Sequence, residues 1–247
     1  MNVYKMRKQA IAYKDGFRGW ETLEEMVSWN AAETAVIIVD MWDKHWSTGA
    51  TKRGAVLADK INALVQRARR QGILIVHAPS DTMDFYKDAE ARKRFLSLSA
   101  GAEDLPETVV VGEYPQPVDS SDQGSDTVDE YKPSGVWTRQ TARIEIDQEN
   151  DLICGDEGGA LRSCLAAKGI TNLFYMGVHT NMCVLNRSFG IKSMLKRGFH
   201  PCLVRDLTDC MYNPAMPPYV SHDEGTALIA GYIEKFYCPT VESKDIG

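Results

Sequence analysis

Cys183 is the residue of this sequence with the clearest chemical setting. It follows the apolar run of residues 172–178 (NLFYMGV), which predicts a strand, and it lies near the start of a helix predicted over about residues 181–196. A cysteine in the first turn of a helix faces free backbone amides, which lower the pKa of its thiol and can stabilise an oxyanion. Thr180 or Asn181 could cap that helix through a side-chain oxygen. Cys183 is therefore the candidate nucleophile.

Polar residues also follow the other apolar runs of the chain. Asp40 follows VIIV, His77 follows ILIV, His179 follows FYMGV and Asp206 follows CLVR. Each could simply cap a helix or satisfy a loop carbonyl. However, parallel sheets bind ligands at the carboxyl ends of their strands, so we expect these four side chains to share one crevice. Asp40 is then the candidate general base for the cysteine.

The elements that must position these residues alternate along the chain. Short apolar runs predict buried strands, and apolar residues at helical spacing predict helices between them. This alternation predicts βαβ units with right-handed crossovers, and hence an α/β fold: a three-layer αβα sandwich with a mainly parallel, Rossmann-like sheet. The strands are expected at 34–42, 73–79, 172–178 and 200–206, and the helices at 53–71, 158–168, 181–196 and 224–236.

Two segments lie outside this alternation in what we expect to be one domain of 247 residues. The first is an N-terminal extension of about residues 1–32. The second is an acidic insertion at about 101–138, which holds nine acidic residues against the single base Lys132, so that its charge is −8 and that of the remaining chain is +2. It is predicted to be a mobile loop, a lid or simply a solvated face.

Composition excludes several classes of function. The net charge of −6 argues against a nucleic-acid partner, and no run of eighteen apolar residues predicts a membrane span. The N-terminus has no apolar core of a signal peptide, and the six cysteines show no CxxC spacing that would indicate a zinc knuckle. We expect a cytoplasmic protein with reduced thiols that acts on a small molecule. The cysteines other than the candidate nucleophile lack its setting: Cys154, Cys164, Cys202, Cys210 and Cys238.

Four stretches carry a family resemblance: AVIIVDMW, GITNLFYMGVHTNMCV, LVRDLTD and HDEGTALIAGYIE. Together they resemble the isochorismatase-like cysteine hydrolases, a superfamily that includes nicotinamidases and N-carbamoyl amidohydrolases. The most specific part is the spacing from Gly169 to Cys183, and the resemblance covers about residues 33–100 and 158–238.

The resemblance implies a function and a site. Cys183 would attack the carbonyl of a small amide or carbamoyl substrate, the C–N bond would break, and water would release the thioester. Asp40 matches the catalytic Asp of the family. A cis peptide would fall at Val178–His179 and, with the amide of Cys183, aim backbone N–H groups at the oxyanion. The family's habit implies a homo-oligomer, a dimer or a tetramer, and no cofactor is expected.

One residue of the family pattern is missing. The third catalytic residue of the family is a Lys at the end of the strand before GALRSCLAAKGI, but no Lys occurs between Lys132 and Lys168. Asp147 falls nearest to the expected position. A carboxylate there would raise the pKa of both Cys183 and Asp40 by like-charge repulsion.

Three solutions to the missing Lys stay open. A cation could fold in from Lys132, Arg139 or Arg143. Alternatively, His77 or His179 could serve as the base of a Cys–His pair, which needs no Lys. If neither holds, the triad is incomplete, and the chain is a diverged family member that binds a small ligand or a partner without catalysis.

Aromatic and metal-ligating residues cluster after the first buried strand. Trp42, His45 and Trp46 are expected to line the pocket, and with Phe85 and Tyr86 they would suit a planar substrate. No metal is expected at the site. The alternative ligand set, based on the Asp-x-His spacing of the DKH stretch, is Asp43, His45 and His77.

Overall fold

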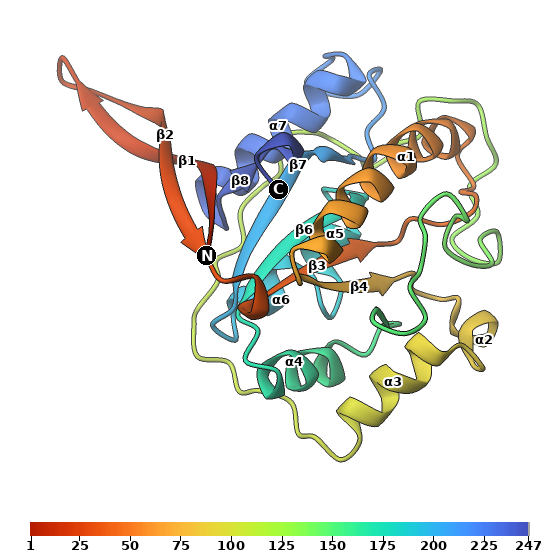
Figure 1. Ribbon diagram of the computed structural model, residues 1–247. Coiled ribbons are helices and arrows are strands. Elements are labelled where there is room, and N and C mark those ends of the chain that lie inside the picture. Colours follow the sequence, from red (N-terminus) through yellow and green to blue (C-terminus); the bar gives the residue numbers. More distant parts are fainter. Residues whose placement is uncertain (247) are drawn as a thin grey trace.

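The structure is a computed structural model that describes residues 1–246. Its single sheet has eight strands in the order β2-β1-β8-β7-β6-β3-β4-β5 (Figure 1). The six strands from β8 to β5 are parallel to one another, while β1 and β2 are antiparallel. The strands are β1 (Asn2–Lys14), β2 (Phe17–Trp29), β3 (Thr34–Val39), β4 (Leu74–Ala78), β5 (Leu152–Ile153), β6 (Asn172–Val178), β7 (His200–Asp209) and β8 (Thr240–Val241).

Helices cover both faces of this sheet, which confirms the predicted three-layer sandwich. They are α1 (Thr48–Arg70), α2 (Met83–Tyr86), α3 (Glu90–Ser99), α4 (Gly158–Ala167), α5 (Cys183–Asn186), α6 (Ile191–Leu195) and α7 (His222–Phe236), with short 3-10 turns at Ala31–Glu33 and Ser243–Asp245. None of these helices is long and apolar enough to span a lipid bilayer.

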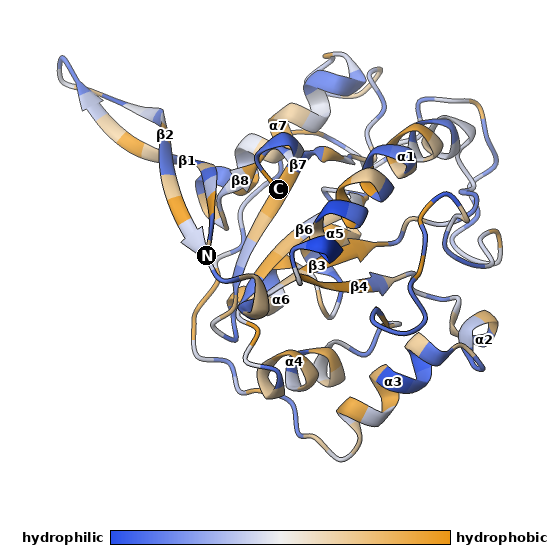
Figure 2. Ribbon diagram, viewed as in Figure 1, coloured by the Kyte–Doolittle hydropathy of each residue, from blue (hydrophilic) through white to orange (hydrophobic). Residues whose placement is uncertain are grey.

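The two layers of the core follow from the pleat of the central strands. Successive residues of β3 point to opposite faces, so Val36 and Ile38 pack with α1 while Ile37 and Val39 pack with α4, α6 and α7. Both faces are covered, and therefore every residue of β3 and β6 is buried. Figure 2 shows these strands as a continuous hydrophobic centre.

The N-terminal segment forms a long β-hairpin that projects from the sandwich (Figure 1). Asp15 and Gly16 form its two-residue turn, and both have positive φ, as the turns that suit the twist of a hairpin require. The hairpin joins the sheet where Arg7 pairs with Thr240 of β8. Arg7 and Gln9 also donate hydrogen bonds to Glu234 on α7.

The acidic insertion runs over the surface of the sandwich without a helix or strand of its own (Figure 1). Its carboxylates pair with basic side chains that the sandwich presents, which explains the opposite signs of the two parts of the chain. These salt bridges include Asp104 with Arg162, Glu107 with Arg197, Glu113 with Lys192 and Asp126 with Arg53. The insertion is therefore anchored at several points by charge.

Two predicted elements differ from the structure. The helix expected over residues 181–196 is broken into α5 and α6, with a turn between them at residues 187–190. At Gly190 a Cβ atom would lie 2.8 Å from the backbone of Leu185, so only glycine fits the close approach of the chain there. The second difference is the length of β7, which continues to Asp209 past an irregular register opposite β6.

The longer β7 changes which carboxylate lies at the sheet edge. Asp206 does not end the strand, and its side chain accepts hydrogen bonds from Ser243, away from the crevice. Asp209 takes the terminal position instead. The expectation for Asp206 was therefore wrong, because the sequence pattern did not reveal the additional residues of the strand.

Candidate active site

Asp40 lies directly after β3, at the carboxyl edge of the sheet, and is fully buried. Its φ of 46° is a left-handed conformation that is uncommon for residues other than glycine. The backbone N–H of Ser80 donates to Oδ1 over 2.8 Å, and Nε of Arg187 donates to Oδ2 over 3.1 Å. Burial raises the pKa of Asp40, and the charge of Arg187 opposes this shift.

Close packing of β6 brings Cys183 to this carboxylate. A Cβ atom on Gly177 would lie 2.1 Å from the carbonyl oxygen of Val39, so glycine is required where β6 passes the end of β3. The peptide bond between Val178 and His179 is cis, at the position that the family resemblance implies. After this bond the chain turns, and Cys183 becomes the first residue of α5.

The Cys183 thiol is half-buried and interacts with the Asp40 carboxyl. Burial and then the negative charge of Asp40 raise the pKa of this thiol well above its ordinary value, and Arg187 only partly offsets them. The sequence-based expectation of a lowered pKa is therefore wrong for the resting site. A neutral thiol beside a carboxylate is instead a proton donor and acceptor pair.

The expected cap of the helix is also wrong. The residue before α5 is Met182, and no side chain caps the helix. Thr180 Oγ1 pairs with Thr208, and the Asn181 side chain bonds the backbone of Met211. These two residues therefore fix the loop to the end of β7. They do not bind the backbone amides of α5, as the sequence suggested.

Cys183 opens onto a pocket of about 250 Å³. Trp42, His45 and Trp46 line it, where the sequence analysis expects them. Burial lowers the pKa of His45 to about 4, and burial together with His45 lowers the pKa of His179 to about 3, so both imidazoles are neutral at neutral pH. The pocket thus presents uncharged aromatic walls to a ligand.

The acidic insertion supplies two walls that the sequence analysis missed, Tyr131 and Trp137. The Trp137 ring stacks on Trp42 with 4.1 Å between the ring centroids, and Tyr131 meets Trp46 edge to face. These residues lie in a segment without periodicity, and only their aromatic character within an acidic stretch could have singled them out. Phe85 lies outside the pocket, stacked under Arg139.

Comparison with known protein families finds a match to the Isochorismatase domain over residues 34–213, which is more than half of the chain. The chain belongs to the isochorismatase family. This assigns it to a family of hydrolases and confirms the resemblance found in the sequence. A search of curated proteins finds no match.

Solved structures share the fold of this chain. A cysteine hydrolase from Pseudomonas syringae pv. phaseolicola is 18% identical with a TM-score of 0.55, over 89% of this chain and 94% of that one. An isochorismatase from Pseudomonas putida is 14% identical with a TM-score of 0.54, over 90% and 94% of the chains. An isochorismatase family protein from Burkholderia thailandensis is 14% identical with a TM-score of 0.50, over 87% and 94%. At these identities the likeness concerns the fold.

The strand before α4 ends later in the chain than the sequence analysis expected. The strand before α4 is β5, Leu152–Ile153, so the position after that strand corresponds to residues 154–156. Asp147 lies before β5, in a turn where it accepts hydrogen bonds from Glu149 and Asn150. The first charged residue after β5 is Asp156. An acidic residue therefore does follow this strand, but it is Asp156 and not Asp147.

None of the cations proposed from the sequence reaches the pocket. Lys132 pairs with Glu130 and Arg143 with Asp59, and both basic side chains are more than half exposed. His77 is buried beside β5, where its ring bonds Asp151 and Gln140. The expectations for Asp147, Arg143 and His77 as third residues of the site are thus not met by their positions.

The cation at the site is Arg187, which the sequence analysis missed. It follows α5 and lines the same pocket as Cys183. Its Nη1 lies 3.2 Å from Asp156 Oδ2, and its Nη2 lies 3.2 Å from Asp81 Oδ2. The sequence does carry a signal for it: residues four apart on a predicted helix share a face, and this spacing relates Arg187 to Cys183.

The alternative metal site is not assembled. Asp43 accepts hydrogen bonds from Thr138, His77 faces Asp151, and His45 stacks in the pocket. Within residues 1–246, no three His, Cys, Asp or Glu side chains converge as metal ligands. The side chains of the three proposed ligands contact different groups and do not face a common point.

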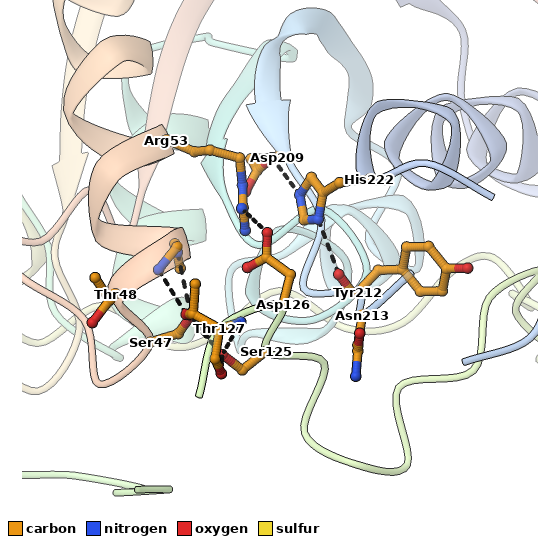
Figure 3. A network of polar contacts seen from close by, with 12 residues as sticks. Ser47, Thr48, Arg53, Ser125, Asp126, Thr127, Asp209, Tyr212, Asn213 and His222 are labelled. Carbon is orange, nitrogen blue, oxygen red and sulfur yellow. Dashed lines mark hydrogen bonds and ion pairs between the residues drawn. The ribbon is translucent and has the colours of Figure 1, made fainter. Parts of the chain in front are cut away.

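A second polar cluster lies at the end of β7 (Figure 3). Asp209 Oδ2 accepts from Arg53 Nε over 3.0 Å, and Asp209 Oδ1 lies 2.9 Å from His222 Nε2. Asp126 of the acidic insertion binds the same arginine, and Nδ1 of His222 lies 2.9 Å from the carbonyl oxygen of Tyr212. This cluster joins α1, β7, α7 and the insertion.

Proposed function

We propose that this protein is a cysteine hydrolase that cleaves the C–N bond of a small amide or carbamoyl substrate through a thioester on Cys183. The observation that carries the proposal is the position of Cys183 at the pocket beside Arg187, whose Nε donates to the buried carboxylate of Asp40 over 3.1 Å. The membership of the chain in the isochorismatase family supports the same reaction class.

The chemistry follows from the proton that the two groups share. Sγ of Cys183 attacks the substrate carbonyl while Asp40 accepts the thiol proton. Asp40 then returns this proton to the departing nitrogen as the C–N bond breaks, which leaves a thioester and a free amine or ammonia. Water attacks the thioester, Asp40 accepts a proton from it, and the proton returns to Sγ as the acid product leaves.

The environment of the pair suits this sequence of steps. Burial raises the pKa of Asp40, and a more basic carboxylate is a better general base for a thiol. The thiol stays protonated until a carbonyl is in place, so the charge develops only during the attack. The backbone N–H groups near the cis peptide of Val178–His179 and at Cys183 would stabilise the oxyanion.

The pocket indicates the size and type of the substrate. Its volume of about 250 Å³ suits a molecule smaller than a typical drug-sized ligand. Its walls include Trp42, Trp46 and Trp137, which favour a planar or apolar body next to the reactive carbonyl. We therefore expect a compact amide with a flat group, and not a peptide or polymer.

The test is ammonia release from a panel of small primary amides and N-carbamoyl compounds. Cys183→Ala should lower kcat by about 10⁴-fold or more, because the nucleophile is lost. Cys210→Ala is the matched control: Cys210 is buried beside the second polar cluster, where it accepts a hydrogen bond from Thr226. Rapid quenching and intact-protein mass spectrometry should show an acyl adduct on the wild type. Unreduced turnover in Cys183→Ala would refute the proposal.

A further inference from the structure

We infer that Arg187 is the positioning cation of this active site and takes over the part that a Lys plays in the family pattern. The inference rests on the proposed function, since it assigns Arg187 to the same Cys183–Asp40 pair. In the chain the charges have exchanged places: a carboxylate, Asp156, follows β5, and the cation comes instead from the residue after α5.

Arg187 gathers carboxylates from three neighbouring strands. Asp40 follows β3, Asp81 follows β4 and Asp156 follows β5, and these three strands are adjacent in the sheet. Each carboxylate takes a different nitrogen of the guanidinium, Nε, Nη2 and Nη1 respectively, at 3.1 to 3.2 Å. A Lys ammonium is a single point charge and could not hold three separate partners in one plane.

The three contacts differ in strength because the carboxylates differ in exposure. The side chains of Asp81 and Asp156 are 52% and 50% exposed, so water screens their pairing with Arg187. The side chain of Asp40 is fully buried and has no such screening. Arg187 is therefore the main counter-charge of Asp40, and the two exposed carboxylates mainly hold the guanidinium in position.

This arrangement fixes the orientation of the catalytic carboxylate. Oδ1 of Asp40 is held by the N–H of Ser80, and Oδ2 by Nε of Arg187. With both oxygens tied at one side, the carboxylate cannot rotate away from the thiol of Cys183. The cation also offsets the negative charge that forms on Sγ or on Asp40 as the proton moves between them.

The pH dependence of Cys183 and Asp40 is set by the charged and titratable groups that face these two residues. Arg187 faces them from the turn after α5, and Asp81 and Asp156 face the guanidinium from the loops after β4 and β5. The neutral rings of His45 and His179 and the phenol of Tyr131 line the pocket, and the exposed Lys44 lines a small cavity next to Asp40. Of these groups, Arg187 is the cation that bonds the Asp40 carboxylate directly. Removing it should therefore raise the pKa of both Asp40 and Cys183.

The experiment compares the wild type with Arg187→Met and Arg187→Lys in the full chain. We measure the pH dependence of iodoacetamide labelling at Cys183 by peptide mass spectrometry, and the pH dependence of kcat and KM. Arg187→Met should move the labelling profile upward by about one pH unit or more. It should also lower kcat by about 10²-fold, with a much smaller change in KM. Arg187→Lys should recover part of both effects, because it restores the charge without the three-way geometry.

Arg143→Met is the matched control, since it removes an exposed arginine that pairs with Asp59 and does not line the pocket. Its labelling profile should stay close to that of the wild type. A thermal unfolding scan of each variant separates lost folding from lost function. If Arg187→Met folds and labels with the wild-type pH profile, Arg187 only anchors α5, and the inference is overturned.

The labelling experiment needs no substrate, so the two proposals can fail separately. A shifted profile in Arg187→Met together with a wild type that hydrolyses no amide would keep the inference and refute the proposed function. Normal hydrolysis by the wild type, with an unshifted labelling profile and an unchanged kcat in Arg187→Met, would keep the proposed function and refute the inference.

Discussion

The two polar clusters at the carboxyl edge of the sheet each contain an aspartate paired with an arginine. They differ in the third side chain that lies next to the aspartate. Asp40 after β3 and Asp209 at the end of β7 each accept a hydrogen bond from the Nε of an arginine, over 3.1 and 3.0 Å. Asp40 then faces a thiol, whereas Asp209 faces the imidazole of His222.

The charge of the third partner decides the state of each carboxylate. Both nitrogens of His222 lie 2.9 Å from oxygens that act as acceptors, one on Asp209 and one on the backbone of Tyr212, and this arrangement favours the doubly protonated, cationic ring. Burial raises the pKa of Asp209, but the hydrogen bond of His222 and the charge of Arg53 outweigh it and lower that pKa. The pKa of Asp40 is instead raised. A carboxylate held by two cations stabilises the fold, while one that shares a proton with a neutral thiol can act as a base.

The largest expected effect is a difference in kcat and in unfolding free energy when the aspartate of each cluster is replaced by asparagine. Asp40→Asn should lower kcat by about 10³-fold, because the general base is lost. The unfolding free energy should change little, because Arg187 keeps its pairs with Asp81 and Asp156 and the cost of burying the Asp40 charge is removed. Asp209→Asn should keep kcat near the wild-type value and lower the unfolding free energy by about 2 kcal/mol, because it leaves the charges of Arg53 and His222 underpaired. Steady-state kinetics and urea unfolding of both variants measure the two effects. Loss of activity with an intact fold in Asp209→Asn would show that the second cluster also serves catalysis.

The sequence predicted the first cluster better than the second, for a physical reason. The β-branched run of β3 and the apolar run of β6 are buried on both faces, so their ends, and with them Asp40 and Cys183, could be located from the pattern. The end of β7 could not, because the irregular register opposite β6 moves it from Asp206 to Asp209. A strand irregularity depends on tertiary pairing and leaves no clear signal in the periodicity.

The missed residues of the active site share a similar cause. Arg187 is brought to Asp40 by the break between α5 and α6, whereas the sequence predicted one continuous helix. Tyr131 and Trp137 reach the pocket from the insertion, whose path is set by salt bridges far apart in the sequence. Local patterns describe strands and helices well, but these contacts depend on long-range charge pairing.

A smaller effect should distinguish the clusters by pH. The folded pKa of His222 is raised above its unfolded value of about 6.5, since the hydrogen bond and charge of Asp209 outweigh burial. Its contribution to stability is therefore fully present below pH 6.5 and is lost as the pH rises through the folded pKa. His222→Gln should cost about 1 kcal/mol at pH 6 and less at pH 9, measured by urea unfolding at both values. An equal cost at both pH values would mean that His222 is neutral in the folded protein.

The smallest expected effect tests whether the acidic insertion couples the two clusters. Asp126 binds Arg53 in the second cluster, and the chain beyond it carries Tyr131 and Trp137 to the pocket of the first. Asp126→Asn should lower the unfolding free energy by under about 1 kcal/mol, because the pair is partly exposed, and this cost should shrink in high salt.

If the salt bridge helps to hold the pocket wall, KM should rise a few-fold at low salt while kcat stays the same. Asp119→Asn is the control, since the Asp119 side chain accepts a hydrogen bond only from Ser121 in its own turn and forms no salt bridge among residues 1–246. An unchanged KM in both variants would show that the clusters work independently, and that the stacking on Trp42 and Trp46 and the hydrogen bonds of Thr138 to Asp43 suffice to hold the insertion's aromatic residues in the pocket.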